Sequence, residues 1–427
     1  MNLPGRFLRL LIMRLRTDPP GMRSGRRRLR VCWTRTVLLG LALSALTACT
    51  TQANGHIRVV RSVFLERGQS VELHALARTR EGGYVIAGRL AGFPWATRVN
   101  AQGEVQWRYL ASIVLPKAGE PAGDSLFTGA VTLPDDSTLL CGYRSRGVTK
   151  ITGLLTHLSP HGRVLSAQTL YPNNDHRYVL NYLQRCVRWG KGVAVVGSTT
   201  RFRKRGTTYT QTNYLWLIKL DDEGRIEWEK LIPNVGGNVE VLKNRNLVLA
   251  AVGIRYGNGN LPSQTEITEI TEIRPDGSIR MQRTIPGHLV LVHSAAPGTS
   301  VSLISEGSSR ATWRTLGTRL QTVARASGST GRIAIKKAYV LPDHALALFG
   351  YTTPPEYGGM LLSSIAWVSP NLRHKQVFTF KPWSIWIADA VPTGKPGEFA
   401  TVREVSSLHH PFDRDRMGIV LSFVRIQ

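Results

Sequence analysis

Cysteine, acidic side chains and long apolar runs are all scarce in this chain of 427 residues. Its 4 cysteines are too few and too scattered for a disulfide scaffold, and no Cys-x-x-Cys pair begins a zinc site. Outside one short N-terminal stretch, no window reaches the roughly 18 apolar residues that cross a bilayer. A polytopic membrane protein is therefore excluded. The 42% of hydrophobic residues also excludes disorder for most of the chain.

Catalytic motifs are missing as well. The sequence contains no Gly-x-Ser-x-Gly elbow, no His-Glu-x-x-His pair and no Walker loop. A pair of acidic residues at 135–136 and a run of three at 221–223 fall in segments that read as tight turns, and the turns account for them. We therefore favour an interaction protein without a cofactor over an enzyme, and leave catalysis open.

A weak metal candidate lies near the C-terminus, where His409 and His410 precede Asp413. Side chains of adjacent histidines diverge, so a site would require both to turn inward together with the aspartate. We expect no metal there.

The shortage of acid leaves a strongly positive chain, with 55 Lys plus Arg against 28 Asp plus Glu and a net charge of +27. Ten of the arginines and one aspartate lie in residues 1–35, before a short apolar run at 36–45. This order is typical of a secretion signal, with Met1, Met13 or Met22 as its start. Without residues 1–48, 45 basic and 27 acidic residues remain, a net charge of +18.

The signal ends in Leu46-Thr47-Ala48-Cys49, which resembles the lipobox of bacterial lipoproteins. The resemblance implies a signal peptide at 1–48, an acylated Cys49 and a lipidated tether at 49–55. Thr50 stands where an aspartate often retains such proteins at the inner membrane, so the resemblance implies the periplasmic face of the outer membrane. The alternative is an uncleaved apolar helix with an incidental cysteine.

The rest of the chain repeats one sequence pattern with a period of roughly 50 residues. Apolar strands recur at 83–88, 137–142, 192–197 and 247–253, with weaker copies at 300–305, 345–350 and 399–402. Tight turns that favour glycine or proline recur at 100–103, 159–162, 221–224 and 274–277, with degenerate copies at 316–319 and 369–372. Trp95 and Trp107 flank the first of these turns at the offsets that Trp216 and Trp228 keep around the third, which indicates packing between sheets.

Four short strands per unit predict an all-β, seven-bladed propeller over residues 56–427. The expected innermost strands are 71–78, 126–133, 182–189, 239–243, 289–295, 335–341 and 385–391. The last unit has only three strands, ending with 418–425, whereas an extra strand at 57–65 begins the body. Pairing of that extra strand into the last blade would close the ring and bring the two ends of the body together.

The segments 82–88 and 100–107 resemble the repeat-built propeller domains of bacterial envelope proteins. Those blades share a Gly-Gly-Tyr-x-x-x-Gly strand and a closing hairpin of Asn or Asp, Gly and Trp. The resemblance spans residues 56–427, grows weaker in the last three units, and implies a fold and not an activity.

One face of the expected ring carries all the long connections, at 111–124, 143–152, 171–181, 198–214, 254–264, 351–360 and 405–417. Long ordered loops usually persist where they contact something. Basic residues that we expect to form a partner-binding face lie in these loops: Arg144, Arg146, Arg201, Arg203, Lys204, Arg205, Arg255, Arg414 and Arg416.

A basic face favours an acidic protein of the cell envelope as partner for a monomeric propeller. Nucleic acid is disfavoured because a membrane-tethered protein outside the cytoplasm seldom meets it. Envelope assembly machinery, or a secreted toxin neutralised by an immunity lipoprotein, are two possible partner classes. Binding or hydrolysis of an anionic envelope glycan, or of another small ligand, is the alternative function.

Cys141 and Cys186 fall on neighbouring expected blades. Outside the cytoplasm a disulfide between them would persist, and two buried free thiols are the other interpretation.

Overall fold

Runs of β-branched, aromatic and small apolar residues, separated by turn-forming residues, give strands along the whole body. The computed structural model describes residues 53–54, 56–67, 70–111, 125–146, 150–205, 208–233, 239–243, 246–256, 264–287, 289–294, 301–305, 311–316, 322–328, 333–353, 361–380, 384–405 and 418–427. One turn of 3₁₀ helix, Pro172–Asn174, interrupts the strands. In this described part, no helix is long and apolar enough to span a membrane.

Four sheets each hold four antiparallel strands that follow one another in the chain. The first contains β3 (Val71–Arg78), β4 (Tyr84–Leu90), β5 (Phe93–Val99) and β6 (Val105–Leu110). The second contains β7 (Ser125–Thr132), β8 (Thr138–Arg146), β9 (Lys150–Leu158) and β10 (Val164–Leu170). The third contains β11 (Tyr182–Trp189), β12 (Gly192–Arg205), β13 (Thr208–Leu220) and β14 (Ile226–Pro233). The fourth contains β15 (Val239–Lys243), β16 (Leu247–Tyr256), β17 (Gln264–Ile273) and β18 (Ile279–Pro286).

An eight-stranded sheet follows, in the order β22-β21-β20-β19-β23-β24-β25-β26. Its first half is β19 (Leu289–Ser294), β20 (Val301–Ser305), β21 (Ala311–Leu316) and β22 (Thr322–Gly328). Its second half is β23 (Ala334–Val340), β24 (Leu346–Thr352), β25 (Leu362–Val368) and β26 (Lys375–Thr379). Both halves are antiparallel, and they are joined by the parallel pairing of 292–294 in β19 with 338–340 in β23.

The last sheet joins the two ends of the body, as the sequence predicts. It contains β27 (Ser384–Pro392), β28 (Glu398–Val405) and β29 (Gly418–Ile426), followed by β2 (Ile57–Arg67) and the two-residue β1 (Ala53–Asn54). β2 runs antiparallel to β29, from Ile57 opposite Ile426 to Arg67 opposite Gly418. The backbone N–H of Gln427 also donates to the His56 carbonyl at 2.8 Å. Closure by the N-terminal strand is confirmed.

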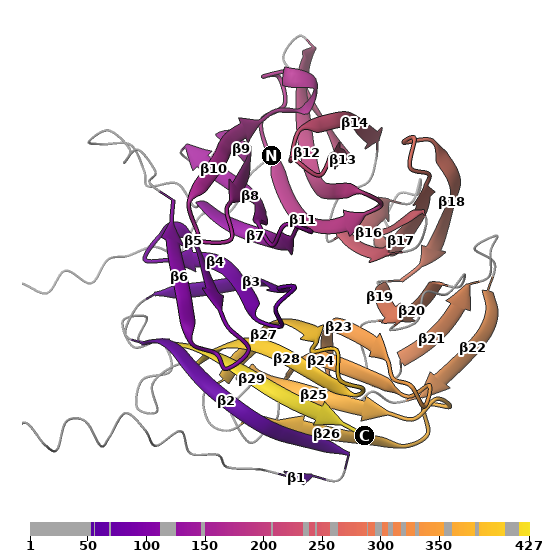
Figure 1. Cartoon of the computed structure of the whole chain (residues 1–427). Coiled ribbons are helices and arrows are strands. Elements are labelled where there is room, and N and C mark those ends of the chain that lie inside the picture. The colour runs from indigo at the N-terminus through magenta and orange to yellow at the C-terminus, as the bar shows by residue number, and fades with distance from the viewer. Residues whose placement is uncertain are drawn as a thin grey trace, which may run out of the picture. The chain divides into compact units, whose positions relative to one another are not determined.

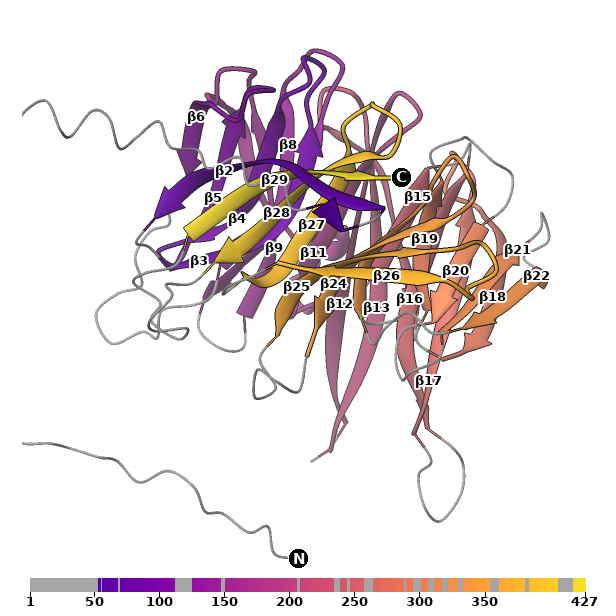
Figure 2. The same ribbon diagram turned by 90° about the horizontal axis from the view of Figure 1, so that it is seen from below.

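The sheets of residues 53–427 lie around a ring, with the indigo and yellow ends of the chain side by side (Figures 1 and 2). The innermost strands β3, β7, β11, β15, β19, β23 and β27 each contact the next, and β27 contacts β3. An all-β propeller of four-stranded blades is therefore confirmed. We expected seven separate sheets, but the described residues form six, because β19 and β23 approach closely enough for three residue pairs to hydrogen-bond.

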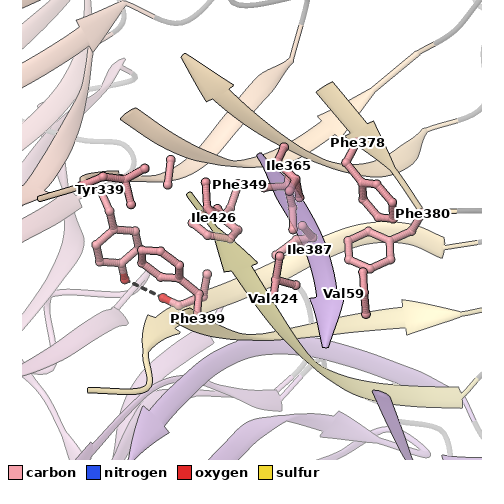
Figure 3. Packing of buried hydrophobic residues seen from close by; sticks show 14 of the residues in the cluster. Val59, Tyr339, Phe349, Ile365, Phe378, Phe380, Ile387, Phe399, Val424 and Ile426 are labelled. Carbon is pink, nitrogen blue, oxygen red and sulfur yellow. Dashed lines mark hydrogen bonds between the residues drawn. The ribbon is translucent and has the colours of Figure 1, made fainter. Parts of the chain in front are cut away.

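Apolar side chains fill the spaces between neighbouring sheets and between the two halves of the eight-stranded sheet. Figure 3 shows the cluster beside the closure, in which Val59 of β2 lies beside Phe380 and Phe399 lies beside Tyr339. In the same cluster the Tyr339 hydroxyl donates to the Ala390 carbonyl at 2.6 Å. The closing strand thus contributes to the core as well as to the sheet.

The predicted role of the tryptophans as packing residues is also confirmed. Trp95 and Trp216 are fully buried. Trp107 lies against the turn glycine Gly162 of the next sheet and donates from Nε1 to the Pro160 carbonyl at 2.9 Å. Gly162 has a φ of +79°, and a Cβ there would lie 2.8 Å from the indole, so this turn requires glycine for two reasons.

Replacement of Ile57 tests how much the closing strand contributes. Ile57 is fully buried in β2, so we expect Ile57→Ala to lower the free energy of unfolding by about 2–5 kcal/mol. Arg58→Ala, at the exposed neighbouring position, should change it by less than about 0.5 kcal/mol. Urea unfolding followed by tryptophan fluorescence measures both variants. Equal urea midpoints for Ile57→Ala and Arg58→Ala would contradict a stabilising role of the closing strand.

Candidate functional site

The expected loop 198–214 is a long β-hairpin, which corrects our prediction. β12 and β13 pair continuously from Val193 opposite Leu220 to Arg205 opposite Thr208. β11 ends its pairing with β12 at Ser198, and β14 ends its pairing with β13 at Tyr214. Residues 199–205 of β12 and 208–213 of β13 therefore extend beyond the four-stranded blade as a two-stranded ribbon, which we call the hairpin extension. The Thr-Tyr-Thr-Gln-Thr run of β13 supplies the β-branched and aromatic residues that favour this strand.

The segment 171–181 supports one side of the hairpin extension. Tyr178 forms a bridge with Arg201, and the Val179 N–H donates to the Thr200 carbonyl at 3.1 Å. Beneath them the buried Asn181 accepts from the Thr199 hydroxyl at 2.5 Å and donates from Nδ2 to the Ile151 carbonyl at 3.0 Å. These contacts hold the edge of β12 that faces away from β13.

Among the described residues, the other side of the hairpin extension is an unpaired strand edge. No strand among the described residues pairs with 208–213 of β13 opposite β12. Because the Thr200 carbonyl points toward Val179, its cross-strand partner Asn213 points its own N–H and C=O away from β12. Backbone direction alternates along a strand, so Gln211 and Tyr209 also face outward. Three residues thus present donors and acceptors at this edge.

Charge near the hairpin extension is mostly positive. The Arg201 guanidinium lies 5.5 Å from the centre of the Tyr178 ring, and the Phe202 side chain beyond it is 42% exposed. Asp175 already accepts from Arg177 at 2.8 Å, and hydrogen bonds from Arg177 lower the pKa of the Asp175 carboxyl to about 2. The nearby acid is therefore engaged by a cation of its own segment.

Most residues of the predicted basic face lie in strands, and the face itself stays a prediction. Arg144, Arg146, Arg203, Lys204, Arg205 and Arg255 lie in strands β8, β12 and β16, where we expected loops. Of these, only the partly buried Arg144 has a described side chain. Arg414 and Arg416 lie outside the described residues, as do Cys49 and the metal candidates His409, His410 and Asp413.

A second charge cluster, which sequence reasoning largely missed, lies among the innermost strands. Asp389 of β27 accepts the Leu76 N–H of β3 at 3.0 Å and the Ala390 N–H at 2.9 Å. Its carboxylate also lies 3.4 Å from Lys337 Nζ of β23 and 3.7 Å from Arg185 Nη1 of β11. We call Arg185, Lys337 and Asp389 the axial cluster, because strands from separate parts of the ring meet there.

A repeated irregularity precedes these residues. In five innermost strands the pairing with the second strand slips, at one place in four of them and at two places in β27, and an extra residue is left in the inner strand. These residues are His74, Thr128, Gln184, Lys336 and Ala388. The residues that follow them include all three members of the axial cluster. Bulges re-aim neighbouring side chains, so a simple alternation of inward and outward positions would not identify this cluster.

The acids that the sequence places on inner strands have different roles. Glu72 contacts Arg89 and accepts from His74 Nε2 at 2.9 Å, and the hydrogen bond with His74 holds the pKa of the Glu72 carboxyl below its ordinary value. The Glu240 side chain lies outside the described part. Within the described ranges, no three His, Cys, Asp or Glu side chains are placed to bind a metal.

A Ser, His and Asp group in the second sheet lacks catalytic geometry. The Ser137 hydroxyl lies 2.8 Å from His157 Nε2 but donates to Asp135 at 2.6 Å. The aspartate therefore engages the serine instead of orienting the histidine, and Ser137 is fully buried. Burial lowers the pKa of His157. This group stabilises a turn.

Cys141 and Cys186 are buried free thiols, the second of the two interpretations given above. Burial, together with its contact with Cys141, raises the pKa of the Cys186 thiol well above its ordinary value. Both side chains lie in the apolar cluster between the second and third sheets.

The chain matches no family model, and no curated protein matches its sequence. Solved structures resemble it only distantly. A Dyadobacter fermentans protein of unknown function is 13% identical over 88% of this chain and 100% of its own, with a TM-score of 0.45. An oligogalacturonate lyase in complex with manganese is 11% identical over 86% and 98%, with a TM-score of 0.49. Kuenenia stuttgartiensis hydrazine synthase is 10% identical over 74% and 97%, with a TM-score of 0.31.

Proposed function

We propose that this protein is a lipid-anchored propeller on the periplasmic face of the outer membrane, and that its hairpin extension binds an extended acidic segment of a partner protein. The open edge of β13 carries this proposal. Tyr209, Gln211 and Asn213 offer backbone groups in the arrangement that strand addition uses.

Charge selects the kind of partner. Residues 199–213 include Arg201, Arg203, Lys204 and Arg205 and no acidic residue. Positive charge beside an open edge opposes pairing between two copies of the chain, which supports a monomeric scaffold. The same charge attracts an acidic strand and suppresses wrong partners.

Seven blades are the architecture that we propose for the body. The eight-stranded sheet divides into two antiparallel halves, and an apolar cluster containing Val290, Ile304 and Leu346 lies between them. Two blades joined by a short parallel contact account for both observations. With the other five sheets, each half then serves as one blade.

The anchor follows from the lipobox resemblance. The tether 49–55 has seven residues and spans at most about 25 Å when fully extended. Lipidation at Cys49 would therefore hold the ring close to the membrane, where the hairpin extension can meet only envelope partners. Assembly machinery and a toxin neutralised by an immunity protein both fit this requirement.

Proline substitutions test strand addition. Tyr209→Pro with Gln211→Pro removes two outward N–H donors without removing a donor to β12, and proline is tolerated at such edges. We expect at least tenfold weaker capture of the envelope partner that the parent protein retains. Thr210→Pro with Thr212→Pro is the matched control, because it breaks the β12 ladder and should lower the thermal midpoint. Undiminished capture by a folded Tyr209→Pro, Gln211→Pro protein would exclude strand addition.

Charge reversal tests the electrostatic component. Replacement of Arg201, Arg203, Lys204 and Arg205 by Glu should abolish capture of the partner, because like charges now face each other. The control carries Glu at Arg163, Lys191, Arg274 and Arg373, which are exposed in the short turns. Quantitative pull-down from solubilised envelopes compares the two, and an unchanged set of partners for the hairpin variant would refute this interface.

Metabolic labelling tests the anchor. Cells that express the parent protein should incorporate labelled palmitate into it, whereas Cys49→Ala should incorporate none. The variant should also leave the membrane fraction, because one tether holds the body there. Equal labelling of the two proteins would show that Cys49 is not the acylated residue.

A further inference from the structure

The tight turns of the ring lie at one of its two ends. They join the first strand of a sheet to the second and the third to the fourth, so within each antiparallel sheet they share one end. Turns of neighbouring sheets also touch. The Arg80 N–H, in the turn after β3, donates to Asp136, in the turn after β7, at 3.1 Å. We call this end of the ring the short-turn end.

The chain enters the ring at the short-turn end. Ile57, the first residue of β2, pairs with Ile426, the last residue of β29. β29 is the third strand of its blade, and the third strand of the other blades ends at a tight turn, as β13 does at 221–225. The start of β2 therefore occupies the place where a fourth strand leaves such a turn.

The hairpin extension leaves the ring at the opposite end. Pairing of β12 with β13 begins at the short-turn end, with Val193 opposite Leu220, and finishes with Arg205 opposite Thr208. Residues 193 and 205 are 12 positions apart, which corresponds to about 40 Å of strand. In Figure 2 the β12–β13 hairpin projects below the ring, whereas the C-terminus lies above it.

The tether is too short to bring its lipid to the end that carries the hairpin. β1 pairs with the start of β2, with Ala53 opposite Arg58. Only four positions separate Ala53 from Cys49, and they span at most about 14 Å. β2 has 11 residues and is about 35 Å long. Even a tether that continues along the edge of β2 therefore ends near the middle of this strand.

The two ends of the ring also differ in charge. The short-turn end carries acids and bases together, and in one turn Arg225 contacts Asp221 at 2.8 Å and Glu223 at 2.6 Å. Residues 199–213 of the hairpin carry four cations and no acid. A cluster of cations without acids is attracted to anionic lipid, whereas paired charges are not. Charge by itself would thus turn the hairpin toward an anionic membrane, and the tether opposes this.

We propose that the short tether turns the short-turn end of the ring toward the lipid surface, and that the hairpin extension points away from the membrane. This inference rests on the proposed lipid anchor at Cys49 and identifies the side from which the partner arrives. The tip of the hairpin stands about 40 Å along the strand from the short-turn end. The acidic segment that it binds therefore belongs to a part of the partner that lies outside the membrane.

Fluorescence quenching by lipid tests this orientation with two positions of one strand. Lys191, in the turn before β12, and Phe202, within β12, are both exposed and are about 36 Å apart along the strand. A fluorophore is attached to Lys191→Cys or to Phe202→Cys of the lipidated full-length protein in phosphatidylcholine vesicles with nitroxide-labelled headgroups. Cys141 and Cys186 are buried, which protects them from the label. We expect loss of fluorescence at 191 and little loss at 202.

Two results in these vesicles would overturn the orientation. They are equal quenching at the two positions and stronger quenching at 202. Substitutions at exposed positions should leave the thermal midpoint unchanged. If Phe202→Cys lowers it, Gln211→Cys places the label on the exposed residue opposite Phe202.

A mass measurement separates failure of the orientation from failure of the anchor. An intact mass without acyl chains on Cys49 would refute the anchor, and the orientation with it. An acylated protein with the wrong order of quenching would overturn the orientation alone.

Vesicles that contain phosphatidylglycerol test whether lipid replaces the protein partner. We expect the same order of quenching as in phosphatidylcholine, because the tether holds the hairpin away from the surface. Stronger quenching at 202 than at 191 in these vesicles would overturn the proposal, since the hairpin would then bind anionic headgroups.

Discussion

Pairing of β2 with β29 is the constraint on which the ring depends. Each blade has two apolar faces, and neither can be covered except by a neighbouring blade. A ring that stayed open would leave two such faces and two strand edges in water. Ile57 and Val59 lie in the cluster on one side of the closure, and Leu65 lies in the cluster on the other. One strand from the start of the body therefore completes the last sheet and joins the two cores beside it.

The closure also explains which features could be predicted. Blade cores require apolar strands and tight turns at every repeat, so both are visible in the sequence. Three of the innermost strands, β3, β11 and β15, have the predicted bounds. The extra strand at 57–65 was identifiable because a three-stranded last unit lacked a partner. That prediction rested on the need to complete the last sheet, and less on the strand propensity of residues 57–65.

The features that were missed belong to positions where the apolar pattern carries no information. Residues 201–205 are almost entirely basic, so nothing marked them as strand, although Thr208 to Thr212 across the hairpin are good strand formers. The axial cluster was missed for another reason. Asp389 was visible as an inner-strand acid, but bulges shift the register before Arg185 and Lys337. Alignment of Ala75, Gly129, Arg185, Lys337 and Asp389 as equivalent repeat positions is the signal that could have found it.

Two charged clusters arise in this ring from two different structural features. The connection between the second and third strands of a blade projects beyond the core, so it can lengthen at no cost to packing, and the hairpin extension grows there. Inner-strand positions cannot lengthen, but a bulge changes the direction of one side chain while the blade keeps its pairing on both sides. Arg185, Lys337 and Asp389 each follow a bulge of their strand, and Gly129 lets β7 approach β11, because a Cβ there would lie 3.1 Å from the Arg185 Cα. The repeat thus permits variation in strand length beyond the blade core and variation in register along the innermost strands, and charged side chains lie at both places.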